Sequence, residues 1–157
     1  MNQIESEFVL NRFCIPSTPQ GVGKTTMIAR VLENLRTSYP NLKIQGFHTG
    51  EIRQEDERVG FEVVTLDGCT APLASINNSS VESIRWPTVG RYKVDVASFE
   101  SLALPELQVK EDTDLFVINE VGKMELFSSL FFPAVLRVLE SKKINLRWLF
   151  LPLVNQR

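Results

Sequence analysis

Apolar residues recur at helical spacing between residues 24 and 38. They lie one, three and four positions apart, which places on one helix face Met27, Ile28, Val31, Leu32 and Leu35. Tyr39-Pro40 follows, and the residue before a proline avoids the helical region. The pattern therefore predicts a helix over about 24–38. A second apolar series predicts another helix over about 126–142, with Pro133 in its first half.

The remaining apolar segments predict strands of two kinds. Leu115 to Ile118 is a continuous apolar run, typical of a strand covered on both faces. Tyr92, Val94 and Val96 alternate with polar residues, which is typical of a half-buried strand. Further strands are predicted over 8–15, 43–47 and 58–66. Strands that alternate with amphipathic helices indicate an α/β domain.

Turn residues predict the connections. Asp67-Gly68 is expected to form a turn, and the small, polar segment 75–83 a surface loop. Ser98 is expected to cap a short helix that Pro105 ends. The segment 147–153 is apolar and has a further proline near its end, and it could form one more strand.

Length and charge narrow the classes of function. The 157 residues fit one domain, 1–157, and the net charge of −2 argues against nucleic acid as a partner. The longest apolar stretch, 149–154, is too short to span a bilayer, and residues 1–7 hold two acids and no base, unlike a targeting signal. We therefore expect a cytoplasmic protein without a membrane partner, and a monomer.

The cysteines do not predict a metal centre. Cys14 and Cys69 are far apart in sequence, and with the chain's one histidine, His48, they cannot supply four Cys and His ligands for zinc. Buried thiols and a single disulfide are the two alternatives. Buried thiols are favoured, because a core of this size does not need a disulfide.

The strongest chemical signal is the sequence Gly21-Val22-Gly23-Lys24-Thr25-Thr26 just before the first predicted helix. Glycines allow backbone N–H groups to turn around phosphate oxygens, and the helix N-terminus favours an anion. Lys24 is expected to neutralise the β- and γ-phosphates and the Thr25 hydroxyl to bind Mg²⁺. The alternative is a glycine-rich turn that starts a helix, with Lys24 solvated.

A second signal follows the apolar run 115–118. Asn119 and Glu120 stand where a P-loop enzyme has the acids that hold magnesium and orient the attacking water. Glu120 suits the second role. Asn119 offers Mg²⁺ an uncharged oxygen, a weaker ligand than carboxylate. The alternative is that Glu120 is an exposed acid at the end of a strand.

Longer stretches resemble the cancer-related nucleoside-triphosphatase family, which includes thermostable microbial members. The matching sequences are GVGKTT at 21–26, IQGFHTGEIR at 44–53, RVGFEVVTLDG at 58–68, GRYKVDVASFESLALPEL at 90–107 and EVGKMELFS at 120–128. The resemblance is strongest over 21–140. It implies a three-layer α/β/α P-loop domain with a mainly parallel central sheet, here incomplete at its C-terminal end.

The resemblance also implies an activity and a site. It implies a magnesium-dependent hydrolase that cleaves the γ-phosphate from ATP, GTP and other nucleoside triphosphates with loose base selectivity. Residues 21–26 would bind phosphate, Thr25, Asn119 and Glu120 would hold the metal, and Lys24, Glu120 and Lys123 would act in catalysis. Glu125 belongs to the same signature as Lys123. A solvated surface lysine is the alternative for Lys123.

The chain departs from the family in several places. Thr18 and Gln20 replace the glycine and proline at the start of the P-loop, Pro16 interrupts the first strand, and Asn119 replaces an aspartate. The resemblance ends near Glu140, which suggests an altered or truncated form of a family member.

These departures leave three functional hypotheses. The first is an active nucleoside-triphosphatase, and the second is a protein that binds nucleotide without turnover. The third, a small-molecule kinase, is weaker, because the arginines that could form a lid are scattered at Arg53, Arg58, Arg85 and Arg91.

Overall fold

The computed structural model describes residues 13–14, 24–118, 122–141 and 147–150, with the backbone alone for 13–14, 24–28 and 147–150. These residues form a sheet with the strand order β1-β8-β7-β2-β3-β4-β6-β5. The strands are β1 (Phe13–Cys14), β2 (Ile44–Gln54), β3 (Glu57–Thr65), β4 (Thr70–Ser75), β5 (Thr88–Val89), β6 (Tyr92–Val94), β7 (Leu115–Ile118) and β8 (Arg147–Phe150).

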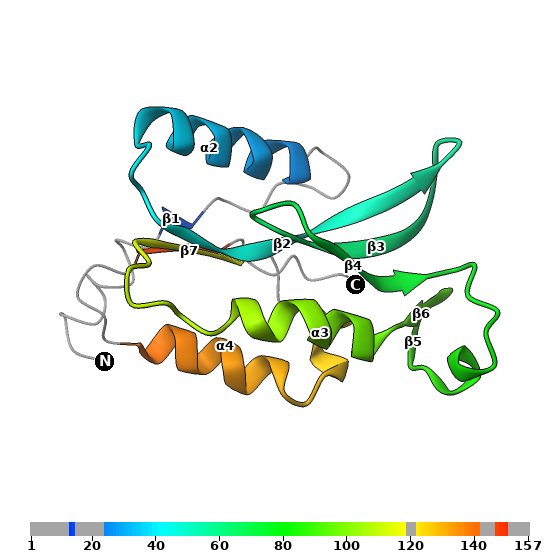
Figure 1. Cartoon of the computed structure of the whole chain (residues 1–157). Coiled ribbons are helices and arrows are strands. Elements are labelled where there is room, and N and C mark those ends of the chain that lie inside the picture. Colours follow the sequence, from blue (N-terminus) through cyan, green and yellow to red (C-terminus); the bar gives the residue numbers. More distant parts are fainter. Residues whose placement is uncertain (1–12, 15–23, 119–121, 142–146, 151–157) are drawn as a thin grey trace.

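The sheet has a parallel half and an antiparallel half. Strands β1, β8, β7 and β2 pair in parallel, whereas β2, β3, β4, β6 and β5 pair antiparallel. The α/β prediction is confirmed. The expectation is a mainly parallel sheet, but the antiparallel part is at least as large as the parallel part. Strand β2 belongs to both halves because it continues as a long hairpin arm past the end of β7 (Figure 1).

Among the described residues, three α-helices complete the layers. Helix α2 (Lys24–Ser38) lies on one face of the sheet, and α3 (Val96–Glu106) and α4 (Phe131–Glu140) lie on the other (Figure 1). The 3₁₀ turns η1 (Glu82–Arg85) and η2 (Glu125–Phe127) are short connecting elements. The observed bounds of α2 match the prediction. The second predicted helix, about 126–142, begins later than expected, at Phe131, because residues 125–127 form the 3₁₀ turn η2 instead. No helix in the described ranges is long and apolar enough to cross a membrane.

The start of α3 corrects one sequence-based expectation. Asp95, not Ser98, is the N-cap: its carboxylate accepts the Ser98 backbone N–H at 3.0 Å and the Ser98 hydroxyl at 2.7 Å. A carboxylate at this position also interacts favourably with the positive end of the helix dipole. Pro105 lies inside the last turn, and the helix continues to Glu106.

Two apolar cores lie on opposite faces of the sheet. The larger core, beneath α3 and α4, holds a cluster of three phenylalanines with ring centroids 5.0 to 6.5 Å apart: Phe47, Phe99 and Phe131. The smaller core, beneath α2, contains Leu32 with Leu115 and Val117 of β7. Since Phe116 and Ile118 belong to the larger core, β7 is covered on both faces, as its apolar run predicts.

Two further strand predictions have clear outcomes, and one observed strand has no counterpart among the predictions. Residues 147–150 do form a strand, β8, between β1 and β7. Strand β2 begins as predicted near Ile44 but extends to Gln54, because β3 pairs with it along the arm. Strand β4 is not predicted from its sequence, Thr70-Ala-Pro-Leu-Ala-Ser75, since its small residues and Pro72 mask the strand pattern.

Gly46 allows β2 and β7 to approach closely. Its φ is +126°, and a Cβ at this position would overlap the backbone of Val117. We predict that Gly46→Ala lowers the free energy of unfolding by about 3–5 kcal/mol, from overpacking and left-handed strain together. Urea denaturation at an unchanged m-value measures this loss.

Gly68→Ala is the matched control. Gly68 has a φ of +92°, but a Cβ there has nothing within 4 Å. The same substitution should therefore cost only the conformational term, roughly 1–2 kcal/mol. Equal losses at both glycines would show that the contact with Val117 is unimportant.

Candidate functional site

The last described residues of three parallel strands, β1, β8 and β7, lie level with one another and with Phe47 in the middle of β2. Cys14 of β1 is the Cα partner of Phe150, Phe150 of Ile118, and Ile118 of Phe47. Neighbouring strands lie about 4.8 Å apart, so the ends of β1 and β7 are about 10 Å apart. The predicted phosphate loop follows Cys14 in the chain, and Asn119-Glu120 follows Ile118. The two predicted motifs therefore leave the sheet at the same edge, which we call the carboxyl edge.

Helix α2 begins near the same end of the parallel strands. Figure 1 shows that its first turn lies toward the side to which β2 points. Lys24, Thr25 and Thr26 form that turn, and the turn contains no acidic residue. The positive end of the helix dipole is therefore not offset by an acid of its own first turn, which suits an anion.

Most predicted site residues lie outside what the structure describes. Gly21, Val22, Gly23, Asn119 and Glu120 lie outside the described residues, and so do the altered positions Pro16, Thr18 and Gln20. Of Lys24, Thr25 and Thr26 the backbone alone is described. Their roles in binding phosphate and metal stay predictions, supported by the common edge from which the two segments start.

Lys123 is the one predicted catalytic residue whose side chain is described, and it is exposed. It follows Gly122, which lies four residues after Ile118, so Gly122 is at most about 14 Å from the end of β7. The lysine thus has solvent access near the carboxyl edge. Exposure fits both the predicted role at the γ-phosphate and the alternative of a solvated surface lysine.

The turn after Lys123 contains a buried acid. Glu125 has an exposed fraction of 3%, and its Oε2 accepts the Gly122 backbone N–H at 3.0 Å. The sequence places Glu125 in the family signature but gives no reason for its burial. A single acid among apolar residues, Met124 and Leu126, carries no periodic signal that separates a buried carboxylate from an exposed one.

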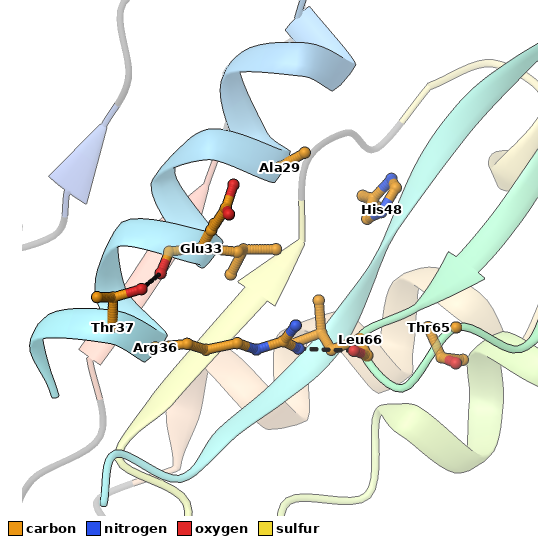
Figure 2. A pocket seen from close by; sticks show the side chains of 9 residues that line it. Ala29, Glu33, Arg36, Thr37, His48, Thr65 and Leu66 are labelled. Carbon is orange, nitrogen blue, oxygen red and sulfur yellow. Dashed lines mark hydrogen bonds between the residues drawn. The ribbon is translucent and has the colours of Figure 1, made fainter. Parts of the chain in front are cut away.

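A pocket of about 490 Å³ lies between α2 and the start of the β3–β4 turn (Figure 2). Figure 2 shows the side chain of Arg36 extended along it toward Leu66, whose carbonyl oxygen accepts an Arg36 N–H at 2.6 Å. His48 of β2 lines the opposite wall. His48 is the residue after Phe47, so the pocket reaches the level at which the parallel strands end.

Burial lowers the pKa of His48. Desolvation of the half-buried ring favours its neutral form, and the Thr49 backbone and the nearby Glu62 carboxylate offset part of this effect. Its buried Nδ1 has no hydrogen-bond partner among the described residues. The sequence assigns no role to His48, which with two cysteines makes too few ligands for zinc. Its place beside α2 comes from tertiary packing, which the local sequence does not show.

The arginines of the hairpin arm are held by neighbouring residues. Arg53 pairs with Glu51, and Arg58 donates to both Glu51 and the Tyr92 hydroxyl. Arg91 pairs with Glu57 and lies 5.5 Å from the centroid of the Tyr92 ring. Three of the four arginines considered for a kinase lid therefore make contacts within the arm and its neighbouring strands, which gives the kinase hypothesis no support.

The predicted free thiol is confirmed for Cys69, but its predicted burial is wrong, because Cys69 is exposed. It lies in the tight turn between β3 and β4, where the Thr65 hydroxyl accepts its N–H at 3.0 Å, and so short a turn leaves its side chain in solvent. Cys14 has no described side chain. Within the described ranges, no group of three or more His, Cys, Asp or Glu residues could hold a metal.

The depressed pKa of His48 predicts a pH effect on stability. The unfolded chain binds a proton near pH 6.5, whereas the folded chain binds it only at lower pH. The free energy of unfolding should therefore be unaffected by His48 above pH 6.5 and should fall as pH drops from 6.5 toward the folded pKa.

The chain's one histidine makes this measurable. Its imidazole NMR resonances should titrate below 6.5, and His48→Gln should reduce the pH dependence of stability in that window. A folded-state midpoint at or above 6.5 would contradict burial as the controlling effect.

Comparison with known proteins agrees with this geometry. Residues 14–149 match the model of the family described as NTPase. The chain is 46% identical over 126 residues to the cancer-related nucleoside-triphosphatase homolog of Bos taurus, covering 77% of this chain and 65% of that protein. It is 41% identical over 133 residues to the nucleoside-triphosphatase THEP1 of Methanosarcina barkeri, covering 84% of this chain and 72% of that protein.

A solved structure shows the same fold. The solution structure of a human cancer-related nucleoside triphosphatase superposes with a TM-score of 0.67 at 38% identity, over 93% of this chain and 79% of that one. The match to the bovine relative spans just under two thirds of that protein's length. The family match reaches residue 149, beyond Glu140 where the resemblance seen in the sequence stops. This chain therefore belongs to the NTPase family.

Proposed function

We propose that this protein binds nucleoside triphosphates with magnesium at the carboxyl edge and hydrolyses them to the diphosphate and phosphate. The observation that carries the proposal is the common level at which β1 and β7 end, with the start of α2 on the same side. Relatives named nucleoside-triphosphatases support the same activity. Loose base selectivity, which the resemblance implies, and a cytoplasmic, monomeric protein, which we expect from the sequence, are further parts of the proposal.

The P-loop would bind the phosphate chain. Residues 21–26 would direct backbone N–H groups toward phosphate oxygens, and α2 would add the positive end of its dipole. Lys24 would neutralise charge on the β- and γ-phosphates. Together these groups bind a polyphosphate without contacting the base, which is consistent with loose base selectivity.

The donors at the edge suit magnesium. The Thr25 hydroxyl, the Asn119 amide oxygen and the Glu120 carboxylate are all oxygen donors, the kind that Mg²⁺ prefers. When bound, the metal would neutralise charge on the β- and γ-phosphate oxygens. Asn119 contributes no charge to this set, so we expect weaker metal binding than with an acid at that position.

The chain's own residues would carry the hydrolysis. Glu120 would orient a water molecule and accept its proton as the water oxygen bonds to the γ-phosphorus. The bond from the γ-phosphorus to the β,γ-bridging oxygen breaks, and the electron pair stays on the diphosphate. Lys123 would stabilise the negative charge that develops on the γ-phosphoryl oxygens and the bridging oxygen.

A second candidate function is nucleotide binding without turnover. Asn119 favours it, because an uncharged metal ligand weakens the site that neutralises the transferred phosphoryl group. Calorimetry separates the two functions: tight triphosphate binding with no phosphate release supports the second, and clear release excludes it.

Lys24→Ala tests the proposed activity. Pure protein with magnesium and ATP or GTP should release phosphate, and the substitution should abolish release because it removes the cation at the β- and γ-phosphates. It should also abolish the rise in melting temperature that ligand binding to the folded state produces. Release unaffected by the substitution would refute the assignment of the P-loop.

Asn119→Asp tests the metal site. A carboxylate restores a charged ligand, so hydrolysis should increase at least 10-fold at limiting magnesium and less at saturating magnesium. Titration of the rate with magnesium measures both. An unchanged magnesium dependence would show that residue 119 does not act at the metal.

A further inference from the structure

Glu125 lies in an unusual place for a carboxylate. It begins η2, three residues after Gly122, with an exposed fraction of 3%. Its Oε2 accepts the Gly122 backbone N–H at 3.0 Å in a buried hydrogen bond. Burying an acid costs free energy unless its hydrogen bonds are made, so an apolar side chain would serve the core better at this position.

The turn around Glu125 is fixed to the rest of the fold. The Leu126 N–H donates to the Gly122 carbonyl at 3.2 Å, and the Ser128 N–H donates to the Glu125 carbonyl at 3.0 Å. The Ser128 hydroxyl also donates to Glu100 of α3 at 2.6 Å. The carboxylate of Glu125 is therefore held on a rigid turn that is anchored to a core helix.

This anchored carboxylate fixes the backbone at Gly122, four residues after the last residue of β7. Gly122 directly precedes Lys123, whose side chain is exposed. A glycine backbone has the widest conformational freedom, so without the hydrogen bond the chain could direct Lys123 in many ways. A hydrogen bond from the Gly122 N–H to a carboxylate is stronger than one to a neutral acceptor. This bond therefore selects one backbone conformation at Gly122 and, with it, one direction for Lys123.

We propose that Glu125 is a positioning residue that, through the Gly122 N–H, directs Lys123 toward the γ-phosphate of a bound nucleoside triphosphate. The inference rests on the proposed function, since it needs a triphosphate at the carboxyl edge. On this inference Glu125 helps the protein to discriminate triphosphate from diphosphate, because only the triphosphate carries the γ-phosphate that Lys123 would contact.

The test compares the affinities for a non-hydrolysable ATP analogue and for ADP, both with magnesium, by calorimetry. Lys123→Ala should weaken triphosphate binding about 10-fold, an interaction of roughly 1.4 kcal/mol, and leave diphosphate binding unchanged. Glu125→Gln keeps an acceptor without the charge and should give a smaller loss of the same kind, about 3-fold; Glu125→Ala should approach the loss seen for Lys123→Ala. The double variant Glu125→Gln/Lys123→Ala should be no weaker than Lys123→Ala alone, because the glutamate acts through the lysine.

Glu100→Gln is the matched control. It makes the same carboxylate-to-amide change beside the same turn, at the Ser128 hydroxyl rather than at Gly122. It should leave the ratio of the two affinities unchanged. Where activity is measured, Glu125→Gln should lower kcat and also raise KM for ATP by about the same 3-fold factor as its loss of triphosphate affinity. A loss of folded protein alone lowers the apparent kcat and changes neither KM nor the affinity ratio.

The outcomes separate the two proposals. A wild-type protein that binds neither nucleotide refutes the proposed function and this inference with it. A wild-type protein that prefers triphosphate, with the preference unchanged in Glu125→Gln or with additive losses in the double variant, refutes the inference alone. If the Glu125 variants do not fold, amide exchange of the wild type decides: the Gly122 N–H should exchange more slowly with the triphosphate analogue than with ADP, and equal rates would overturn the proposal.

Discussion

Strand β7 is buried on both faces and paired on both edges, and the rest of the structure is arranged around it. Leu115 and Val117 pack beneath α2, while Phe116 and Ile118 pack against the core of α3 and α4. Its parallel neighbours β8 and β2 bring its last residue level with Cys14 of β1 and with Phe47 of β2. Burial of these four residues therefore fixes both the layering of the domain and the position of the carboxyl edge.

The antiparallel half supports this edge in a different way. Beyond Phe47, β2 leaves the parallel strands and pairs with β3 as an arm. Arg58 and Tyr92 connect that arm to β6, and Arg53 and Arg58 of the arm pair with its own acid, Glu51. The arm is thus stabilised locally, and its positive charges are engaged within it. The cations proposed to act on the phosphates, Lys24 and Lys123, come instead from the segments that follow β1 and β7.

The sequence predicts the elements whose pattern is strongly periodic or continuously apolar. Helix α2 and strand β7 appear at the predicted residues, because one-sided and two-sided burial leave clear signatures. Strand β4 and the length of β2 are not predictable in this way, since they depend on pairing with β3 rather than on their own pattern. The prediction of Ser98 as the α3 N-cap is wrong because Asp95 and Ser98 are both residue types that suit an N-cap. Only the three-dimensional geometry shows that Asp95 takes this position.

The candidate site shows the same division. Lys24, Thr25 and Glu120 follow from motifs, because the chemistry of phosphate binding requires particular residue types at short spacing. The burial of Glu125 and the position of His48 beside α2 depend on tertiary packing, which the local sequence does not encode. Glu125 and His48 are therefore visible in the sequence as a buried-or-exposed acid and a lone histidine, but their surroundings become known only from the three-dimensional structure.

Amide hydrogen exchange of the whole chain, with and without magnesium and a non-hydrolysable ATP analogue, tests the location of the site most directly. A triphosphate held at the carboxyl edge should slow exchange in residues 15–26 and 119–123, the segments that follow β1 and β7, and leave the arm of β2 and β3 unchanged. Protection confined to the arm or to the pocket beside His48, with none after β1 and β7, would contradict the proposed site.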